Sequence, residues 1–209
     1  MEKTNTKQEI LDTALDLFST QGFEATSISQ LADAVGIRKA SMYSHFASKQ
    51  EILDALMNQV LEEYEEHSLF ARANWDDPAF IEGKRKMTAD TAVREILGQT
   101  RYILHDPLVS RGRKLLTIEQ FRNTQMAAAQ TKQNYEDVMA YFTGLVRFLI
   151  AEGKLTGGEP DIMAAQLCLP ISVWINLCDR EPEREGEILA LIERHVRQFF
   201  ERNGASAAE

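Results

Sequence analysis

The chain has 209 residues, of which 44% are hydrophobic and 26% are charged, proportions that are ordinary for a soluble globular protein. The length allows one large domain or two small ones. No apolar run approaches the roughly 20 residues of a membrane span, and the N-terminus has no apolar signal core. We therefore expect a cytoplasmic protein with no membrane segment.

The formal net charge of −9 is unevenly distributed along the chain. Residues 1–50 hold five Lys/Arg and six Asp/Glu and so carry −1, whereas the remaining residues hold 18 and 26 and carry −8. Because a local basic patch sets the contact with nucleic acid, an acidic body does not exclude DNA binding. It favours a protein that reads a site over one that coats DNA.

The first predicted helix runs from Thr6 to Gln21, with an apolar face that includes Ile10, Ala14 and Phe18. A second, short helix follows Ser27, where apolar residues recur at the i, i+3, i+4, i+7 spacing through Val35. The Ser27 hydroxyl can accept from the free amides of the first turn, so we predict Ser27 as the N-cap. Gly36 suits the left-handed conformation that ends a helix.

A third helix is predicted just after Ile37, with Met42 and Phe46 facing inward. The outward face holds basic, small and hydroxyl side chains, namely Lys39, Ala40, Ser41, Ser44 and His45. Between Ala34 and Gln50 there are three cations, Arg38, Lys39 and Lys49, and no acid. A helix that reads DNA needs small or polar residues to reach base edges and donors at its flanks for phosphates. The pattern therefore predicts a helix-turn-helix DNA-binding domain over residues 1–50.

This region resembles the tetracycline-repressor (TetR) family of bacterial transcriptional regulators. The matching motifs are Gly22-Phe23, Ser27-Ile28, Val35-Gly36-Ile37, Lys39-Ala40-Ser41-Met42-Tyr43-Ser44-His45-Phe46 and Ser48-Lys49-Gln50-Glu51-Ile52-Leu53. The resemblance covers about the first 55 residues. It implies that Tyr43, His45 and Lys49 contact phosphates and that Arg38, Lys39, Ala40 and Ser41 lie near bases. With Ser27 and Ser44, these are the predicted DNA-binding residues. Many members have Thr or Ser where Ala25 or Ala40 stands, so contacts there can differ.

Residues 51–209 are predicted to form a larger helical domain for ligand binding and dimerisation, which makes the chain all-α. A fourth helix, capped by Ser48, should run towards residue 70 and link the two domains. We interpret Trp75 to Met87 as a loop with one helical turn at most. The basic triplet Lys84-Arg85-Lys86 within it is typical of a solvated surface rather than of a DNA-binding arm.

Five more helices complete the prediction. The first begins at Thr88 or Asp90 and ends near His105. The other four run from Val109 to Arg122, from Gln125 to Glu152, from Pro160 through Leu177, and from Glu185 to Arg202. The segment Ile162 to Leu177 is apolar nearly all round, so it must be covered on every side, and a subunit interface is the simplest cover. Pro170 should bend this helix.

The chemistry of site recognition also favours a dimer. One such module reads only a few base pairs, whereas two modules about 34–36 Å apart read both halves of a palindrome. The resemblance implies a homodimer in which the helices near 125–152 and 160–178 form a four-helix bundle with their mates. We therefore expect the DNA partner to be a double-stranded, inverted-repeat operator.

The resemblance further implies a regulator that responds to a small-molecule effector. Release from DNA by the effector favours a repressor, and activation stays an open alternative. The body has few charges on its apolar faces, which favours an apolar or aromatic ligand. Large side chains in the expected helices are the candidate ligand-binding residues, namely Tyr102, Phe121, Met126, Tyr141 and Trp174. Each of them can equally be an ordinary core residue.

Other functions find less support in the sequence. The four histidines lack paired zinc spacing, and G-x-S-x-G, P-loop and G-x-G-x-x-G motifs are absent, so we expect no enzyme, metal or cofactor. Cys168 and Cys178 are ten residues apart in a helix, about 15 Å and beyond disulfide reach, which favours two buried thiols. Arg180 near Cys178 leaves a redox role open. The rival function is a relative that has lost DNA binding and acts as a protein-binding co-activator or a ligand-binding protein.

Overall fold

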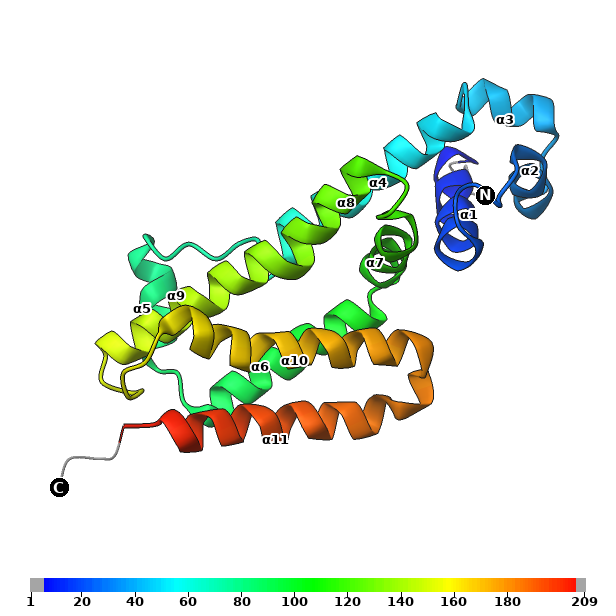
Figure 1. Ribbon diagram of the computed structural model, residues 1–209. Coiled ribbons are helices and arrows are strands. Elements are labelled where there is room, and N and C mark those ends of the chain that lie inside the picture. Colours follow the sequence, from blue (N-terminus) through cyan, green and yellow to red (C-terminus); the bar gives the residue numbers. More distant parts are fainter. Residues whose placement is uncertain (1–5, 206–209) are drawn as a thin grey trace, which may run out of the picture. The chain divides into compact units, whose positions relative to one another are not determined.

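The computed structural model describes residues 6–205, and their only regular secondary structure is helical, as predicted (Figure 1). Within this part of the chain, the one β-type pairing is an isolated bridge between Leu155 and Gly204. The chain divides into two compact units. The first contains residues 6–66 and 107–130, and the second contains residues 67–106 and 131–205.

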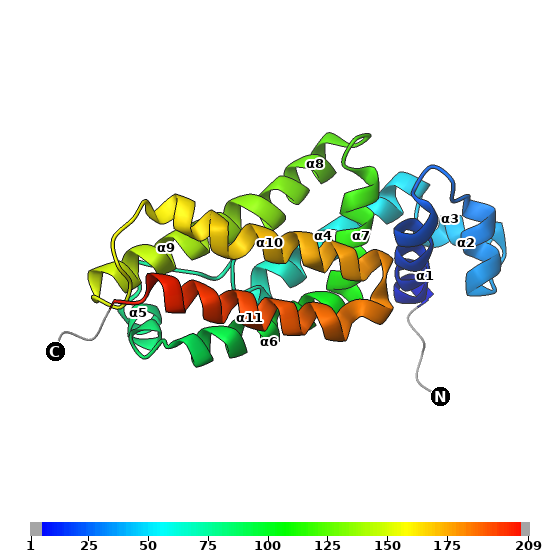
Figure 2. The same ribbon diagram turned by 60° about the horizontal axis from the view of Figure 1, so that its bottom comes forward.

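The first unit contains the two helices of the predicted helix-turn-helix and four further helices. Its elements are α1 (Thr6–Gln21), α2 (Ile28–Val35), α3 (Lys39–His45), α4 (Lys49–His67), α7 (Pro107–Glu119) and α8 (Thr124–Thr131). Figures 1 and 2 show α1 beside α2 and α7, which are its packing partners. One apolar core joins these helices and includes Phe18, Leu31, Met42, Leu56 and Leu115. The boundary predicted at residue 50 marks the end of the DNA-binding domain and stays a prediction. The compact unit is larger than that domain, because it extends to residue 66 and includes residues 107–130.

The predicted ends of the first helices agree with the structure. The α1 helix has the expected bounds, and Ser27 caps α2 by accepting from the Gln30 amide while the Gln30 side chain accepts from the Ser27 amide. This reciprocal pair satisfies two amides that have no partner within the helix. Gly36 ends α2 with a φ of 79°, in the left-handed region, which lets the chain turn sharply into α3.

The second unit is a bundle around a separate core. Its elements are α5 (Pro78–Arg85), α6 (Ala89–His105), a π-helical turn (Lys132–Glu136), α9 (Asp137–Ala151), α10 (Pro160–Arg180), a 3₁₀ turn (Pro182–Arg184) and α11 (Glu185–Asn203). In Figure 2, α10 runs beside α9 and α11, and α11 also packs on α6. The core includes Val93, Phe142, Leu167, Ile171 and Ile192.

The interpretation of Trp75 to Met87 as a loop was wrong, because Pro78–Arg85 forms α5. Asp77 caps this helix by accepting from the Ala79 amide at 2.9 Å, and Pro78 occupies the first turn, where its missing N–H costs nothing. Phe80 packs edge-on against Trp75, with ring centroids 5.0 Å apart. Short capping residues and one aromatic contact therefore stabilise a helix too short for its periodicity to be evident.

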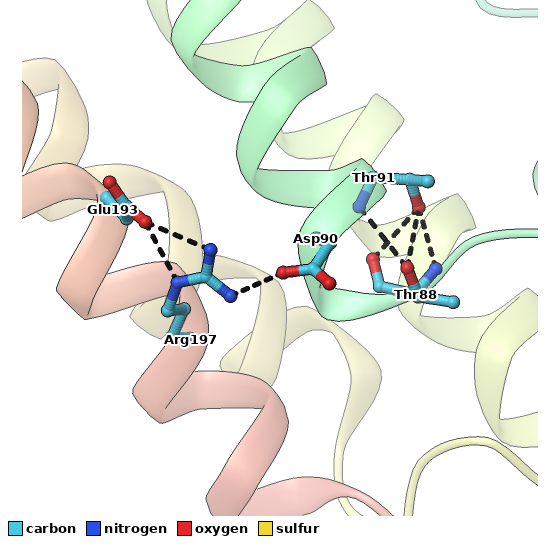
Figure 3. Close-up of polar contacts among 5 residues, drawn as sticks. All are labelled: Thr88, Asp90, Thr91, Glu193 and Arg197. Carbon is cyan, nitrogen blue, oxygen red and sulfur yellow. Dashed lines mark hydrogen bonds and ion pairs between the residues drawn. The ribbon is translucent and has the colours of Figure 1, made fainter.

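Two polar clusters fix the start of α6 (Figure 3). Thr88 and Thr91 cap the helix reciprocally, with the Thr91 hydroxyl accepting from the Thr88 amide at 2.7 Å. Arg197 of α11 donates to Asp90 at 2.6 Å and is held in turn by Glu193 (Figure 3). The hydrogen bond and charge of Arg197 lower the pKa of the Asp90 carboxyl. These contacts connect α6 to α11 across the second unit.

The α10 helix contains Pro170, as predicted, and the bend expected there stays a prediction. By length and composition alone, α10 is the one helix in residues 6–205 that is apolar enough to cross a membrane. Core helices satisfy the same criterion, and here Met163, Leu167, Ile171 and Ile175 are buried in the second core.

Candidate nucleic-acid interface

The connection between α2 and α3 forms a tight helix-turn-helix. The Ile37 amide donates back to Ala32 at 2.9 Å, and the Gly36 amide donates to Asp33 at 3.2 Å. The Arg38 carbonyl then accepts from the amides of Ser41 and Met42, which begins α3. The turn is therefore closed by backbone hydrogen bonds, and the side chains of α3 are left to face either the core or the solvent.

One side chain of α3 is buried in the core, and most of the others are exposed to solvent. Met42 is fully buried, and Phe46 is buried directly after the helix. The Tyr43 side chain remains 49% exposed. His45 is half-buried. Six further predicted DNA-binding residues are exposed, namely Ser27, Arg38, Lys39, Ala40, Ser41 and Ser44. The predicted division into an inward and an outward face is thus confirmed, and the DNA contacts themselves stay predictions.

Some polar side chains on this face already form hydrogen bonds within the protein, and others do not. The Ser44 hydroxyl donates to the Ser41 carbonyl at 2.6 Å, and the Ser27 hydroxyl serves the α2 cap. In the described part of the chain, no hydrogen bond or ion pair involves the side chains of Arg38, Lys39 and Ser41. These three side chains therefore keep their donors available for a ligand.

Lys49 differs from the other cations of this region. Its ammonium donates to the Phe23 carbonyl at 2.7 Å and to the Thr26 carbonyl at 2.9 Å. It also lies 4.1 Å from the centroid of the Phe23 ring, within the range of a cation–π interaction. The predicted contact of Lys49 with phosphate stays a prediction, and in this structure the ammonium serves the turn before α2.

A carboxylate far along the chain also contacts this turn. Glu119, the last residue of α7, is buried, and its Oε1 accepts from the Phe23 amide at 2.8 Å. The sequence did not predict a role for Glu119, since nothing in the local pattern there connects it to a turn 96 residues earlier. Only the packing of α7 on α1 brings the two together.

A comparison with known families agrees with this geometry. The sequence model described as bacterial regulatory proteins, tetR family, matches residues 10–56, which extend from α1 into α4. This N-terminal part of the chain is therefore similar to bacterial regulatory proteins of the tetR family. The matched segment contains the complete turn-helix unit with its exposed α3 face.

Individual proteins also show a similarity over part of the chain. The chain is 38% identical over 61 residues to the HTH-type transcriptional repressor KstR2 of Rhodococcus jostii (strain RHA1), a match covering 29% of this chain and 30% of the repressor. The similarity thus spans less than a third of the relative's length.

Solved structures show that the fold of the whole chain is that of TetR-family regulators. A TetR-family transcriptional regulator from Mesorhizobium loti MAFF303099 superimposes with a TM-score of 0.61 at 17% identity, covering 98% of this chain and all of the other. A transcriptional regulator from Saccharomonospora viridis in complex with choline gives 0.61 at 16% identity, with coverages of 98% and 100%. At such identities the likeness concerns the fold alone.

The five residues predicted to bind a ligand are divided between the two units of the chain. Phe121 and Met126 belong to the first unit, whereas Tyr102, Tyr141 and Trp174 belong to the second. Phe121 is 90% exposed in the turn after α7, while Met126 is buried. Tyr141 is buried and hydrogen-bonded to Lys84 at 2.8 Å, and the half-buried Trp174 packs edge-on against His195. Neither unit by itself brings all five together, and their ligand contacts stay predictions.

The sequence predicted that the whole Lys84-Arg85-Lys86 triplet is solvated, and this is wrong for Lys84. Lys84 is buried among Glu95, Tyr141 and Phe80, whereas Arg85 and Lys86 are exposed. Both cysteines are buried and neither forms a disulfide within the described residues, as expected for reduced thiols. Within residues 6–205, no group of three or more His, Cys, Asp and Glu side chains is arranged to hold a metal ion.

Proposed function

We propose that this protein is a dimeric DNA-binding transcriptional regulator, and specifically a repressor that a small apolar or aromatic ligand releases from a palindromic operator. The observation that carries the proposal is the exposed face of α3, where Arg38, Lys39 and Ser41 have uncommitted donors. The TetR-family domain and the repressor activity named for the Rhodococcus relative support it.

The side chains of α3 have the chemistry that DNA recognition requires. Lys39 and Ser41 can donate to base edges, and small Ala40 lets the helix approach the floor of the groove. Tyr43 and His45 lie farther along α3, where they can donate to phosphates and so fix the register of the helix on the duplex. A regulator of this kind would act in the cytoplasm, where its operator lies.

An uncovered stripe on α10 supports dimerisation. Ile162 is 51% exposed and Val173 is 63% exposed. They are 11 residues apart, close to three full helical turns, and therefore lie on the same face of α10. Half-buried Leu169 lies between them on that face. Exposed apolar side chains in a row favour an interface, so we assign α10, with its packing partner α9, to the twofold contact.

For the effector, the first unit offers a groove between α4 and α8 with a volume of about 700 Å³. Its apolar residues include Leu53, Met57 and Met126, and its rim carries Asn58 and Gln125. An apolar floor with a few amide groups is the usual environment of a small apolar ligand. Of the five predicted ligand-binding residues, Met126 lines this groove, which supports an effector contact there.

The proposed function is tested by selecting binding sequences from random duplex DNA with the purified protein at one moderate salt concentration. We expect enrichment of an inverted repeat with half-sites about one helical turn apart, as two linked modules require. A folded, dimeric protein that enriches no sequence would contradict the proposal and would favour the protein-binding co-activator.

A further inference from the structure

The outward face of α3 is centred on two small residues, Ala40 and Ser44. The middle residue of the helix, Met42, is fully buried in the core of the first unit. Successive residues of an α-helix are rotated by about 100°, so Ala40 and Ser44, two residues before and after Met42, each lie about 160° from it. Both are exposed. Because a helix-turn-helix inserts its second helix into the major groove with the face turned away from the core, these two residues face the floor of the groove.

The longer side chains of α3 lie on the flanks of this face. Ser41 and Tyr43 are the sequence neighbours of Met42 and lie about 100° from it, on opposite sides of the helix. Lys39 begins the helix and lies only about 60° from the buried direction of Met42. The long donors are therefore at the edges of the DNA-facing side, and the centre has none.

The Ser44 hydroxyl adds no donor to the centre of the face. It donates to the Ser41 carbonyl at 2.6 Å, so its hydrogen is directed back to the helix and only its lone pairs remain for a base. The Ala40 side chain is a single methyl group. The centre of α3 thus presents one apolar group and one acceptor, four residues apart on the same side of the helix.

One base offers a methyl group as partner to Ala40 in the major groove. Thymine carries a 5-methyl group there, whereas guanine, adenine and cytosine present hydrogen-bond acceptors and amino donors. A side-chain methyl group placed against those polar groups would remove them from water without providing a hydrogen bond, which is costly. Against the thymine methyl, the same contact buries apolar surface of both partners and is favourable.

We propose that Ala40 is a specificity-determining residue, which selects a thymine in each half-site of the operator through contact between its methyl group and the thymine 5-methyl group. This assignment rests on the proposed DNA-binding function and adds the base that the centre of α3 selects. A hydroxyl at the same position, as Ser or Thr would supply, can bond to several bases. The lack of a hydroxyl at Ala40 therefore makes the contact selective.

The test compares thymine with deoxyuridine, which differs from it only by lacking the 5-methyl group. The duplex enriched by the selection above, called the selected duplex, is prepared with each thymine of the half-site replaced in turn, in both half-sites together. For the wild-type protein we expect one such replacement to lower affinity about fifteenfold, which is about fourfold for each methyl group lost from a buried contact.

Two variants of Ala40 assign this loss to its side chain. Ala40→Gly removes the methyl group of the protein and should abolish the difference between thymine and deoxyuridine at that position. Since both duplexes are titrated with the same variant, a general loss of affinity or of folded protein cancels. Ala128→Gly, at an exposed alanine of α8, is the matched control and should keep the full difference. Ala40→Ser adds a hydroxyl that bonds to several bases, so it should also reduce the difference.

Two results would overturn the role of Ala40. A selected duplex in which every thymine can be replaced by deoxyuridine without loss of affinity would show that α3 contacts no methyl group. An undiminished difference in folded Ala40→Gly would assign the methyl contact to another side chain, and if that variant does not fold, the Ala40→Ser result decides. Wild-type protein that enriches no sequence would instead overturn the proposed function itself.

Discussion

Lys84 lies in a buried polar cluster of the second unit with Glu95 and Tyr141. Its side chain is 7% exposed, and its ammonium donates to both oxygens of Glu95, at 2.6 and 2.7 Å, and to the Tyr141 hydroxyl. Tyr141 also donates to Glu95. Burial, followed by the negative charge of Glu95, raises the pKa of the Tyr141 hydroxyl, so it remains a donor at all ordinary pH values. Each member of this cluster depends on the others to satisfy its hydrogen bonds.

Lys84→Met should therefore lower the free energy of unfolding by about 2–3 kcal/mol, because it leaves the Glu95 carboxylate without its counter-charge. The value lies below the roughly 3–5 kcal/mol of a fully buried pair, because the Glu95 side chain is 30% exposed. Lys86→Met, two residues away and exposed, is the control and should change stability by less than about 0.5 kcal/mol. Urea denaturation measures both, and equal effects of the two substitutions would contradict the structural role of Lys84.

Cys168 is expected to be chemically inert in the folded protein. Burial raises the pKa of its thiol to about 12, and the reactive species is the thiolate. In a Cys178→Ser background, a thiol reagent at pH 8 should modify Cys168 only after denaturant is added. Modification of the native protein as fast as that of free cysteine would show that the thiol is accessible and would reopen a redox role.

Tyr43 is the exposed aromatic residue of α3 and should contribute a phosphate contact. Tyr43→Ala should weaken binding to the selected duplex about tenfold while leaving the dimer intact, because one hydrogen bond to a charged group is lost. Tyr135→Ala removes another exposed tyrosine, in the π-helical turn, and should leave DNA affinity unchanged. A titration in which both variants bind like the wild type would refute the role of Tyr43.

At the scale of elements, capping residues decide where the helices begin. Ser27 with Gln30, Thr88 with Thr91, and Asp77 each satisfy amides at a helix start. Such pairs are local in sequence, which is why the beginnings of α2 and α6 were predictable. The α5 helix follows the same rule, but its cap lies in a stretch with Gly83 and three basic residues, and composition there suggested a loop.

The stripe on α10 carries a prediction about assembly. Val173→Arg should convert the dimer to a monomer with unchanged helical content, because a charge would be placed at the centre of an apolar contact. Phe121→Arg changes a more exposed apolar side chain outside α10 and should leave the dimer intact. Light scattering gives the mass of each. A Val173→Arg protein that remains a dimer at micromolar concentration would show that another surface forms the contact.

At the scale of the whole molecule, the sequence by itself determined the helical fold class, the helix-turn-helix and the outward face of α3. These follow from apolar spacing, caps and a left-handed glycine, all of which act within a few residues and can be read locally. The tertiary structure alone decided that Lys84 is buried, that the predicted ligand-binding residues fall into two units, and that Lys49 and Glu119 meet at Phe23. Those outcomes depend on which distant helices pack together. A local pattern cannot show which carbonyl, carboxylate or ring a charged side chain will reach once the core has formed.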